Sequence, residues 1–341
     1  MSDAVQLSGA PGSPYTRKML AVLRYRRIPY RFLIGTHGGP PGLPKPKVEL
    51  LPTFYLPNKD GVLEAVVDST PIIRRLEREH AGRAVVPSDP ALRFIDELLE
   101  DYADEWLTKA MFHYRWYYTA DIERAGDILP IWRGITAPAD QLTAAKAMFS
   151  QRQIDRLYVV GSNAVTAPVI EASYVRFLAL MEAHLAHHPF LMGGRPGASD
   201  FGAYGQLTQL SHFDPTPMAL TLEKAKRVFA WTDVMEDLSG LEPGAWLDPA
   251  DLPPTLIALF GELARTYVPV MLANARALKA GDDTVETEID GLPWTQQPFP
   301  YQGKCLSWLR LSHATLPDKA KAIVDALLDA TGCAPLIRET I

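Results

Sequence analysis

The sequence predicts a small α/β domain at the N-terminus and a larger all-helical region behind it. Within residues 1–84, short runs of β-forming residues alternate with two amphipathic helical stretches. Residues 84–90 contain two prolines and form a linker, and beyond it apolar residues recur mostly at helical spacing. A chain of 341 residues with 47% hydrophobic residues has room for two domains and a large core.

The first domain begins with a strand–helix–strand unit. We expect strands at 4–8 and 30–34, with a helix over 15–26 between them. Ser13-Pro14 marks the start of that helix, because a serine side chain caps free N–H groups and proline fits the first helical turn.

The rest of the first domain is expected to add a hairpin and a second helix. In order, we expect a Gly- and Pro-rich loop over 35–47, a strand over 51–56, a turn over 58–61, a strand over 62–67 and a helix over 71–80. Asp68 or Ser69 is the expected cap of that helix.

The first domain is basic: residues 1–84 hold 13 lysines and arginines against 7 aspartates and glutamates. This balance suits a small anionic ligand, although surface charge also varies between domains without one.

The all-helical region divides into residues 88–238 and a C-terminal extension, residues 239–341. The expected helices cover 91–118, 171–188, 200–211, 221–238, 254–279, 303–313 and 317–331. Residues 281–302 are polar and proline-rich with no clear period, so we expect a loop there.

Composition and charge exclude several classes of function. The net charge of −6 argues against non-specific binding of nucleic acid. No apolar run reaches the length that spans a bilayer, and the N-terminus has no apolar core of signal-peptide length. We therefore expect a cytoplasmic protein without nucleic-acid or membrane partners.

Cysteine and histidine give little support for a metal site. The two cysteines, Cys305 and Cys333, are too few for a disulfide framework or a thiolate cage. His184, His187 and His188 have the spacing of metal ligands on one helix. They also lie in its last turn, where positive charge is favourable, and no further ligand is near in sequence. We expect no metal.

Four motifs follow one another across residues 1–238: the first-helix motif Ser13-Pro14-Tyr15-Thr16-Arg17-Lys18, the strand-opening pair Leu51-Pro52, the acidic-Ser pair in Asp68-Ser69-Thr70-Pro71-Ile72, and the segment 190–201 that enters a buried helix. These motifs resemble those of serine-type glutathione transferases, and they occur in family order. Two positions depart from the family pattern. Asp68 stands where the acid is often Glu, and Gly197 replaces the Ser or Thr cap three residues before Asp200.

The resemblance implies a thioredoxin-like N-terminal domain, an all-α C-terminal domain and glutathione as co-substrate. The implied binding residues are Leu51, Pro52, Asp68, Ser69, Lys45 and Lys47. A cis bond before Pro52 would turn the Leu51 backbone toward glutathione, which then pairs with it as an added strand does. Asp68 and Ser69 would hold the γ-glutamyl end at a helix N-terminus. One of the two lysines would reach the glycine carboxylate.

Ser13 is the expected catalytic residue. A free thiol titrates at about 8.5, and a helix N-terminus or a hydrogen-bond donor lowers that value. Ser13 has both features, because it stands at a positive helix end and carries a hydroxyl that can donate to a thiolate. The alternative is that Ser13 only caps the helix. No cysteine lies nearby, which disfavours a glutaredoxin-like mechanism.

Aromatic residues gather at the end of the long helix expected over 91–118. In the family that helix faces the electrophile, so Tyr114, Tyr117 and Tyr118 are the expected walls of the substrate pocket. The alternative is plain core, which is the more frequent role of an aromatic stripe on a helix. Asp200 is expected to have a structural role and no catalytic one.

The sequence thus predicts an enzyme that uses the glutathione thiolate to attack an apolar electrophile, by conjugation or by reductive cleavage. The alternative is a non-catalytic glutathione- or ligand-binding scaffold on the same fold, which would bind immobilised glutathione without turning over electrophiles. By resemblance alone, we expect a homodimer formed through the first domain and the long helix of the second. The sequence does not identify the electrophile or the role of residues 239–341.

Overall fold

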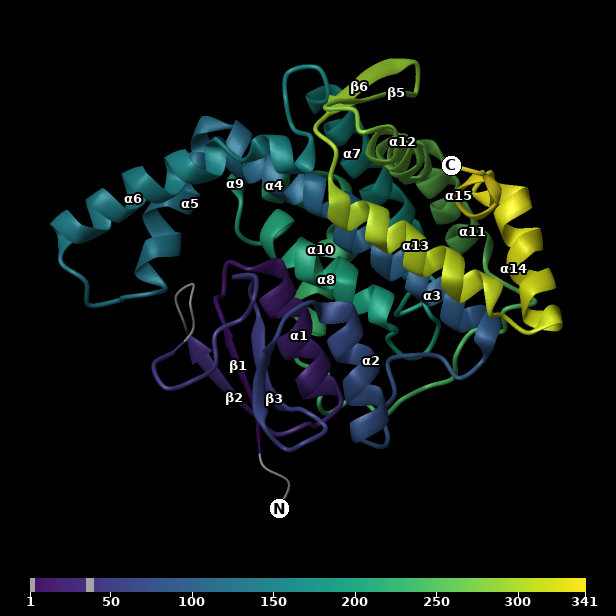
Figure 1. Cartoon of the computed structure of the whole chain (residues 1–341), viewed down its shortest axis with the longest axis horizontal. Helices are drawn as coiled ribbons and strands as arrows, with labels where there is room; N and C mark the ends of the chain where they lie inside the picture. Colours follow the sequence, from purple (N-terminus) through teal and green to yellow (C-terminus); the bar gives the residue numbers. More distant parts are fainter. Residues whose placement is uncertain (1–3, 35–39) are drawn as a thin grey trace.

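A computed structural model of the chain describes residues 4–34 and 40–341. Its N-terminal part has the predicted α/β order (Figure 1). The elements are β1 (Val5–Gly9), α1 (Pro14–Tyr25), β2 (Tyr30–Ile34), β3 (Thr53–Pro57), β4 (Leu63–Val66) and α2 (Ser69–Glu79). The four strands form one sheet in the order β2-β1-β3-β4, with β2 parallel to β1 and the other pairs antiparallel. Part of the expected loop over 35–47, residues 35–39, lies outside the described residues.

Helix α1 joins the sheet to the helical domain. It buries its apolar side chains, and it packs against α8 (Ala198–Leu210), which is buried along its whole length. Gly205 allows this close approach, because a Cβ at that position would lie 2.6 Å from the carbonyl oxygen of Pro14. The contact fixes the first turn of α1, and with it Ser13, against the core.

The helical domain contains the predicted long helix and a pair of helices that the sequence did not resolve. Its elements are α3 (Pro90–Tyr102), a π-helical turn (Ala103–Leu107), α4 (Thr108–Tyr117), α5 (Thr119–Ile131), α6 (Ala139–Ile154), a 3-10 turn (Leu157–Val160), α7 (Ala167–Leu185), α8, α9 (Pro215–Lys224) and α10 (Lys226–Met235). The single helix expected over 221–238 is wrong, because the backbone leaves helical geometry at Ala225 (φ −148°, ψ 72°).

The α5–α6 pair projects from the body of the molecule as a long hairpin (Figure 1). Only Ser150 and Gln153 are buried on α6. A small apolar cluster around Trp116, Ala125 and Phe213 attaches the hairpin to α4 and to the end of α8. The hairpin is therefore attached at one end and largely exposed along the other.

The C-terminal extension is not all helical. It contains α11 (Pro254–Glu262), a π-helical turn (Leu263–Tyr267), α12 (Val268–Ala280), β5 (Val285–Ile289), β6 (Leu292–Gln296), α13 (Pro300–Ala314), α14 (Asp318–Thr331) and α15 (Ala334–Arg338). The loop expected over 281–302 is wrong, because β5 and β6 form an antiparallel hairpin. Asp290 (φ 53°) and Gly291 (φ 72°) form its turn, in the left-handed conformation that short hairpins prefer.

The extension shares the core of the other two parts. Helices α13 and α14 pack against α3, and Figure 1 shows α13 lying along it.

The expectation that no apolar segment reaches the length that spans a bilayer is wrong in one place. Among the described residues, the 27-residue helix Pro254–Ala280 is long and apolar enough by length and composition. Inside the protein, 67% of its apolar window is buried, as in the core helix of a soluble protein.

Candidate functional site

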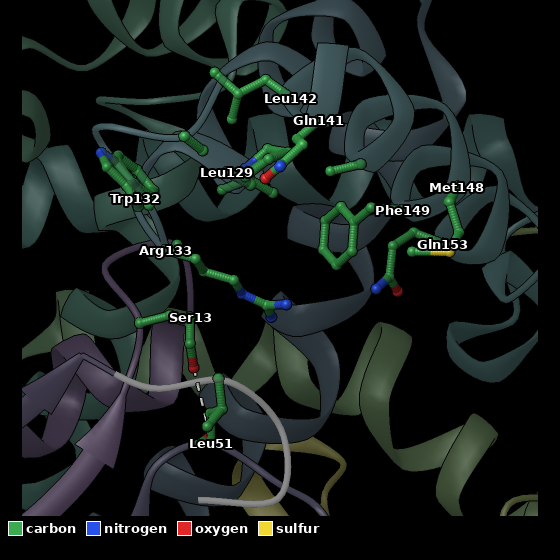
Figure 2. Close-up of a pocket in the computed structure, with 16 residues that line it drawn as sticks. Ser13, Leu51, Leu129, Trp132, Arg133, Gln141, Leu142, Met148, Phe149 and Gln153 are labelled. Carbon is green, nitrogen blue, oxygen red and sulfur yellow. Dashed lines mark hydrogen bonds between the residues drawn. The ribbon is translucent and has the colours of Figure 1, made fainter. Parts of the chain in front are cut away.

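A cavity of about 400 Å³ lies between the N-terminal domain and the α5–α6 hairpin (Figure 2). Ser13 and Leu51 line one side. The opposite side is formed by the end of α5, the turn after it and α6, including Leu129, Trp132, Arg133, Leu142, Met148 and Phe149. The first group carries hydroxyl and backbone groups, whereas the second is mostly apolar. This is the arrangement expected of a site that places a polar ligand beside an apolar one.

Ser13 occupies the N-cap position of α1 and faces this cavity. Its Oγ accepts a hydrogen bond from the Thr16 N–H at 3.2 Å, so the predicted cap is confirmed. The same hydroxyl points at the carbonyl oxygen of Leu51, but at 3.4 Å. That separation is long for an O–H···O bond. The Ser13 proton is therefore held only weakly and is available to a closer acceptor.

The loop that carries Ser13 is anchored from the helical domain. Arg115 of α4 donates from Nη1 to the carbonyl oxygen of Gly12 at 3.0 Å. The same guanidinium is buried against Asp214 and Gln209. The position of Ser13 thus depends on packing between the two domains as well as on the local cap.

Leu51 and Pro52 lie beside Ser13, immediately before β3. Their peptide bond is cis, as the resemblance implies. Leu51 is partly exposed and lines the cavity, whereas Pro52 is buried. No described residue accepts a hydrogen bond from the Leu51 N–H. A backbone donor therefore remains available at the rim of the cavity.

Asp68 and Ser69 begin α2, but the Asp68 side chain does not cap the helix as expected. The Asp68 backbone has φ 85°, and its Oδ2 accepts a hydrogen bond from the Tyr301 hydroxyl at 2.7 Å. Burial raises the pKa of the Asp68 carboxyl, and the hydrogen bond from Tyr301 opposes that rise. The Tyr301 contact uses Oδ2, and no described side chain hydrogen-bonds Oδ1 of Asp68, which leaves that oxygen for a ligand.

Ser69 is supported from behind by a buried lysine. Lys18 of α1 donates from Nζ to Ser69 Oγ at 3.0 Å, to Glu100 Oε1 at 2.8 Å and to Asp104 Oδ2 at 2.5 Å. Burial opposes the charged form of Lys18, but Asp104 and Glu100 outweigh it and raise the pKa of the lysine. A hydroxyl has one proton to donate. Because Ser69 accepts from Lys18, that proton is free for an anionic ligand at the start of α2.

The remaining predicted site residues lie elsewhere. Lys45 and Lys47 are exposed, and neither pairs with a described residue nor lines the cavity. Tyr114 is buried against Tyr174, and the Tyr118 hydroxyl donates to Glu171. Tyr117 is exposed. None of the three predicted pocket tyrosines lines the cavity beside Ser13, since the α5–α6 hairpin stands in that place.

The structure adds candidate site residues that the sequence did not indicate. Lys18 and Tyr301 reach Ser69 and Asp68 from distant parts of the chain, and Arg133 lines the cavity opposite Ser13. A lysine within the apolar stripe of α1 was the one available signal for Lys18. No comparable signal marks Tyr301 or Arg133.

His184, the first histidine of the triplet, and Asp200 have structural partners. His184 pairs with Thr255 Oγ1 and with the carbonyl oxygen of Phe190. Across the described part of the chain, no group of three His, Cys, Asp or Glu side chains is placed to hold a metal ion. Asp200 accepts from the Gly197 N–H at 2.9 Å and from the Leu191 N–H at 2.8 Å. Burial raises the pKa of Asp200 to about 8.

A thioredoxin-like domain followed by a helical domain, with a hydroxyl at the start of the first helix, defines the class of this protein. The N-terminal domain model of glutathione S-transferases matches residues 7–84, and the C-terminal domain model matches residues 143–233. The chain belongs to the glutathione S-transferase family.

Solved structures of the family are similar to the chain at low identity. A glutathione transferase family member from Pseudomonas fluorescens, with bound S-(propanoic acid)-glutathione, is 18% identical over 71% of this chain and 100% of that chain (TM-score 0.38). A Tau class glutathione S-transferase from mango is 18% identical over 68% and 88% (TM-score 0.40). A glutathione S-transferase from Methylobacterium radiotolerans, in complex with glutathione sulfonate, is 19% identical over 72% of this chain and 98% of that chain (TM-score 0.38). No curated protein matches the chain.

Proposed function

We propose that the protein binds glutathione between β3, α1 and α2 and activates its thiol for attack on an apolar electrophile in the cavity. One observation carries the proposal. The Ser13 hydroxyl stands at the N-terminus of α1, lines the cavity and makes only a long contact with the Leu51 carbonyl. Membership of the glutathione S-transferase family supports the choice of ligand.

The tripeptide would lie along the edge of the first domain. Its cysteinyl backbone pairs with Leu51, next to Pro52, where the N–H has no described partner. Its γ-glutamyl carboxylate meets the free N–H groups at the start of α2 and the Ser69 proton. The γ-glutamyl ammonium meets Oδ1 of Asp68, whose other oxygen is held by Tyr301. Lys45 or Lys47 remains the proposed partner of the glycine carboxylate.

Ser13 performs two tasks at once in this proposal. Its oxygen accepts from the Thr16 N–H while its proton is donated to the glutathione sulfur. Donation to the thiolate favours the ionised form, and the positive end of α1 adds to this effect. The thiol proton leaves to solvent, and the sulfur then attacks the electrophile bound against α5 and α6. In conjugation a carbon–sulfur bond forms as the leaving group departs with its electron pair, and reductive cleavage is the other form of the proposal.

Substitution of Ser13 tests the mechanism. Ser13→Ala is expected to raise the pKa of bound glutathione, by about one unit for the loss of a charge-assisted hydrogen bond, while affinity stays nearly unchanged. Spectroscopic titration of the bound thiol measures the pKa, and calorimetry measures affinity. Ser13→Gly is the matched control for the cap, since glycine costs a helix N-terminus only a few tenths of a kcal/mol. Ser13→Thr should restore the low pKa. An unchanged thiol titration in both Ala and Gly variants would remove Ser13 from the mechanism.

Binding and turnover separate the enzyme from a scaffold. A protein that is retained on immobilised glutathione, is eluted by free glutathione and conjugates none of a panel of electrophiles is the non-catalytic alternative.

We also propose a homodimer. Because α13 and α14 pack on α3, an interface that uses the long helix must include the extension. Light scattering measures the mass in solution, and a mass equal to one chain would contradict the dimer.

A further inference from the structure

The cavity wall opposite Ser13 contains a cation among apolar side chains. Arg133 follows α5 and is exposed, and its neighbours on that wall include Leu129, Trp132 and Phe149. Figure 2 shows its guanidinium extending into the space between Ser13 and Phe149. The guanidinium carbon lies 5.5 Å from the centre of the Phe149 ring. The aromatic face thus orients the side chain toward the cavity without neutralising its charge.

Arg133 has no counter-ion among residues 4–34 and 40–341. No described carboxylate lies within ion-pair distance, and no described acceptor receives a hydrogen bond from its side-chain N–H groups. A guanidinium carries five donors in a rigid fork that matches a carboxylate. All of these donors are therefore free to meet a ligand.

A second cation lies close by. Partial loss of hydration lowers the pKa of Arg133, and repulsion from Arg152 lowers it further. Arg152 is exposed at the end of α6 and has no described ion pair either. Two unneutralised guanidinium groups near an apolar surface favour an anion at this wall, because an anion would offset both the repulsion and the lost hydration.

We propose that the electrophile is an apolar molecule carrying a carboxylate, and that Arg133 binds this carboxylate while the reactive carbon faces the sulfur beside Ser13. The inference rests on the proposed function, and it assigns a substrate class to the same site. The carboxylate is a handle and is unchanged by the reaction. With an aryl chloride, the thiolate sulfur bonds to the ring carbon, the carbon–chlorine bond breaks, and chloride leaves with the bonding pair.

A pair of probes that differ only in charge tests the proposal. The first is a chloronitrobenzoate with chlorine para to the carboxylate and the nitro group ortho to chlorine. The second is the corresponding carboxamide. Each kcat/KM is divided by the uncatalysed rate with glutathione, because the amide activates the ring more strongly. The protein should favour the benzoate, and Arg133→Gln should lower that preference about tenfold, the effect expected for one hydrogen-bonded charge pair.

Two further variants control for charge and geometry. Arg124→Gln removes the same charge from exposed α5 outside the cavity lining and should keep the preference for the benzoate. Arg133→Lys retains the charge without the fork and should give an intermediate preference. A thermal melt of each variant checks that the fold is intact. Equal preference in the Arg133→Gln and Arg124→Gln variants overturns the proposal.

Direct binding separates failure of this inference from failure of the proposed function. Calorimetry is performed with glutathione and with the two S-aryl glutathione conjugates that the probes produce. Tighter binding of the carboxylate conjugate, lost in Arg133→Gln, supports the inference even if turnover is slow. Equal binding of both conjugates by a protein that binds glutathione overturns the inference alone. Weaker binding of glutathione itself in Arg133→Gln, with no change between conjugates, assigns Arg133 to the glycine carboxylate and also overturns it. No binding of any of the three overturns the proposed function.

Discussion

Two regions enclose the cavity: the part of the N-terminal domain that carries Ser13 and Leu51, termed the glutathione wall after the proposed ligand, and the α5–α6 hairpin, termed the hairpin wall. Each region holds, outside the cavity lining, a lysine paired with two carboxylates, but in opposite environments. On the glutathione wall, Lys18 pairs with Glu100 and Asp104, and the exposed side-chain fractions are 1%, 1% and 10%. On the hairpin wall, Lys146 of α6 pairs with Glu123 and Asp127 of α5, and the fractions are 28%, 59% and 59%. The same set of charges is therefore enclosed by protein on one wall and open to water on the other.

This difference indicates how the two walls divide their tasks. A buried charge that loses its partner destabilises a protein strongly, whereas an exposed pair contributes little. The glutathione wall is thus fixed by the core on which Ser69 and Ser13 depend. The hairpin wall has few buried residues, so its side chains can be exchanged without unfolding the molecule. A constant tripeptide suits the first wall and a variable electrophile suits the second.

The largest expected effect is a loss of stability on replacing Lys18. Lys18→Met leaves Asp104 and Glu100 buried without their cation, although Arg74 still pairs with Glu100 at 3.1 Å. We expect the free energy of unfolding to fall by about 3–5 kcal/mol in urea denaturation. Lys146→Met is the matched control on the hairpin and should change stability far less. The double variant Lys18→Met with Asp104→Asn should recover part of the loss. Equal losses for Lys18→Met and Lys146→Met would contradict the comparison.

Local signals in the sequence predicted the helix start and the strands of the glutathione wall, but not its contacts with Lys18 and Tyr301. Ser13-Pro14 predicted the start of α1, and residues 30–34 were predicted as the second strand with the same limits as β2. These features are set by neighbours in sequence, through caps, proline and β-forming runs. Asp290-Gly291 was also a local signal for a hairpin, but the polar composition of 281–302 concealed it.

The hairpin wall and the role of the extension depend on contacts between distant residues. Whether Tyr114 or Phe149 faces Ser13 is decided by how α5 and α6 fold back over the cavity, and periodicity along one helix does not contain that information. The contact between Tyr301 and Asp68 joins residues 233 positions apart. Resemblance to a family also gives no signal there, because it ends near residue 238.

The next largest effect concerns Tyr301, which brings the extension into the glutathione wall. Tyr301→Phe removes the donor to Asp68 Oδ2, so glutathione should bind about threefold to tenfold more weakly. The hydrogen bond opposes the rise in the pKa of Asp68, so its loss raises that pKa further. The ammonium of glutathione needs the ionised carboxylate. On acidification, affinity should therefore begin to fall at a higher pH in the variant than in the parent protein.

Calorimetry with glutathione over a range of pH measures both effects of Tyr301→Phe. Asp68→Asn is the companion variant, since it lacks the titrating group. It should bind glutathione weakly with no such pH dependence, and adding Tyr301→Phe to it should change little. A pH profile of Tyr301→Phe that coincides with that of the parent protein would show that the extension only packs against the site.

The smallest expected effect is a change in KM for the electrophile on replacing Met148 of the hairpin. It is also the most direct test of whether the two walls act separately. Met148 lines the cavity and is 74% exposed. Met148→Gln should leave the free energy of unfolding within about 0.5 kcal/mol, and glutathione affinity should not change. The KM for an apolar electrophile should rise about twofold to fourfold, since losing roughly one methylene of apolar contact costs ~0.8 kcal/mol. Ile135→Gln, at an exposed residue of the same hairpin outside the cavity lining, should leave all three quantities unchanged. If Met148→Gln instead weakens glutathione binding as much as electrophile binding, the two walls do not act separately.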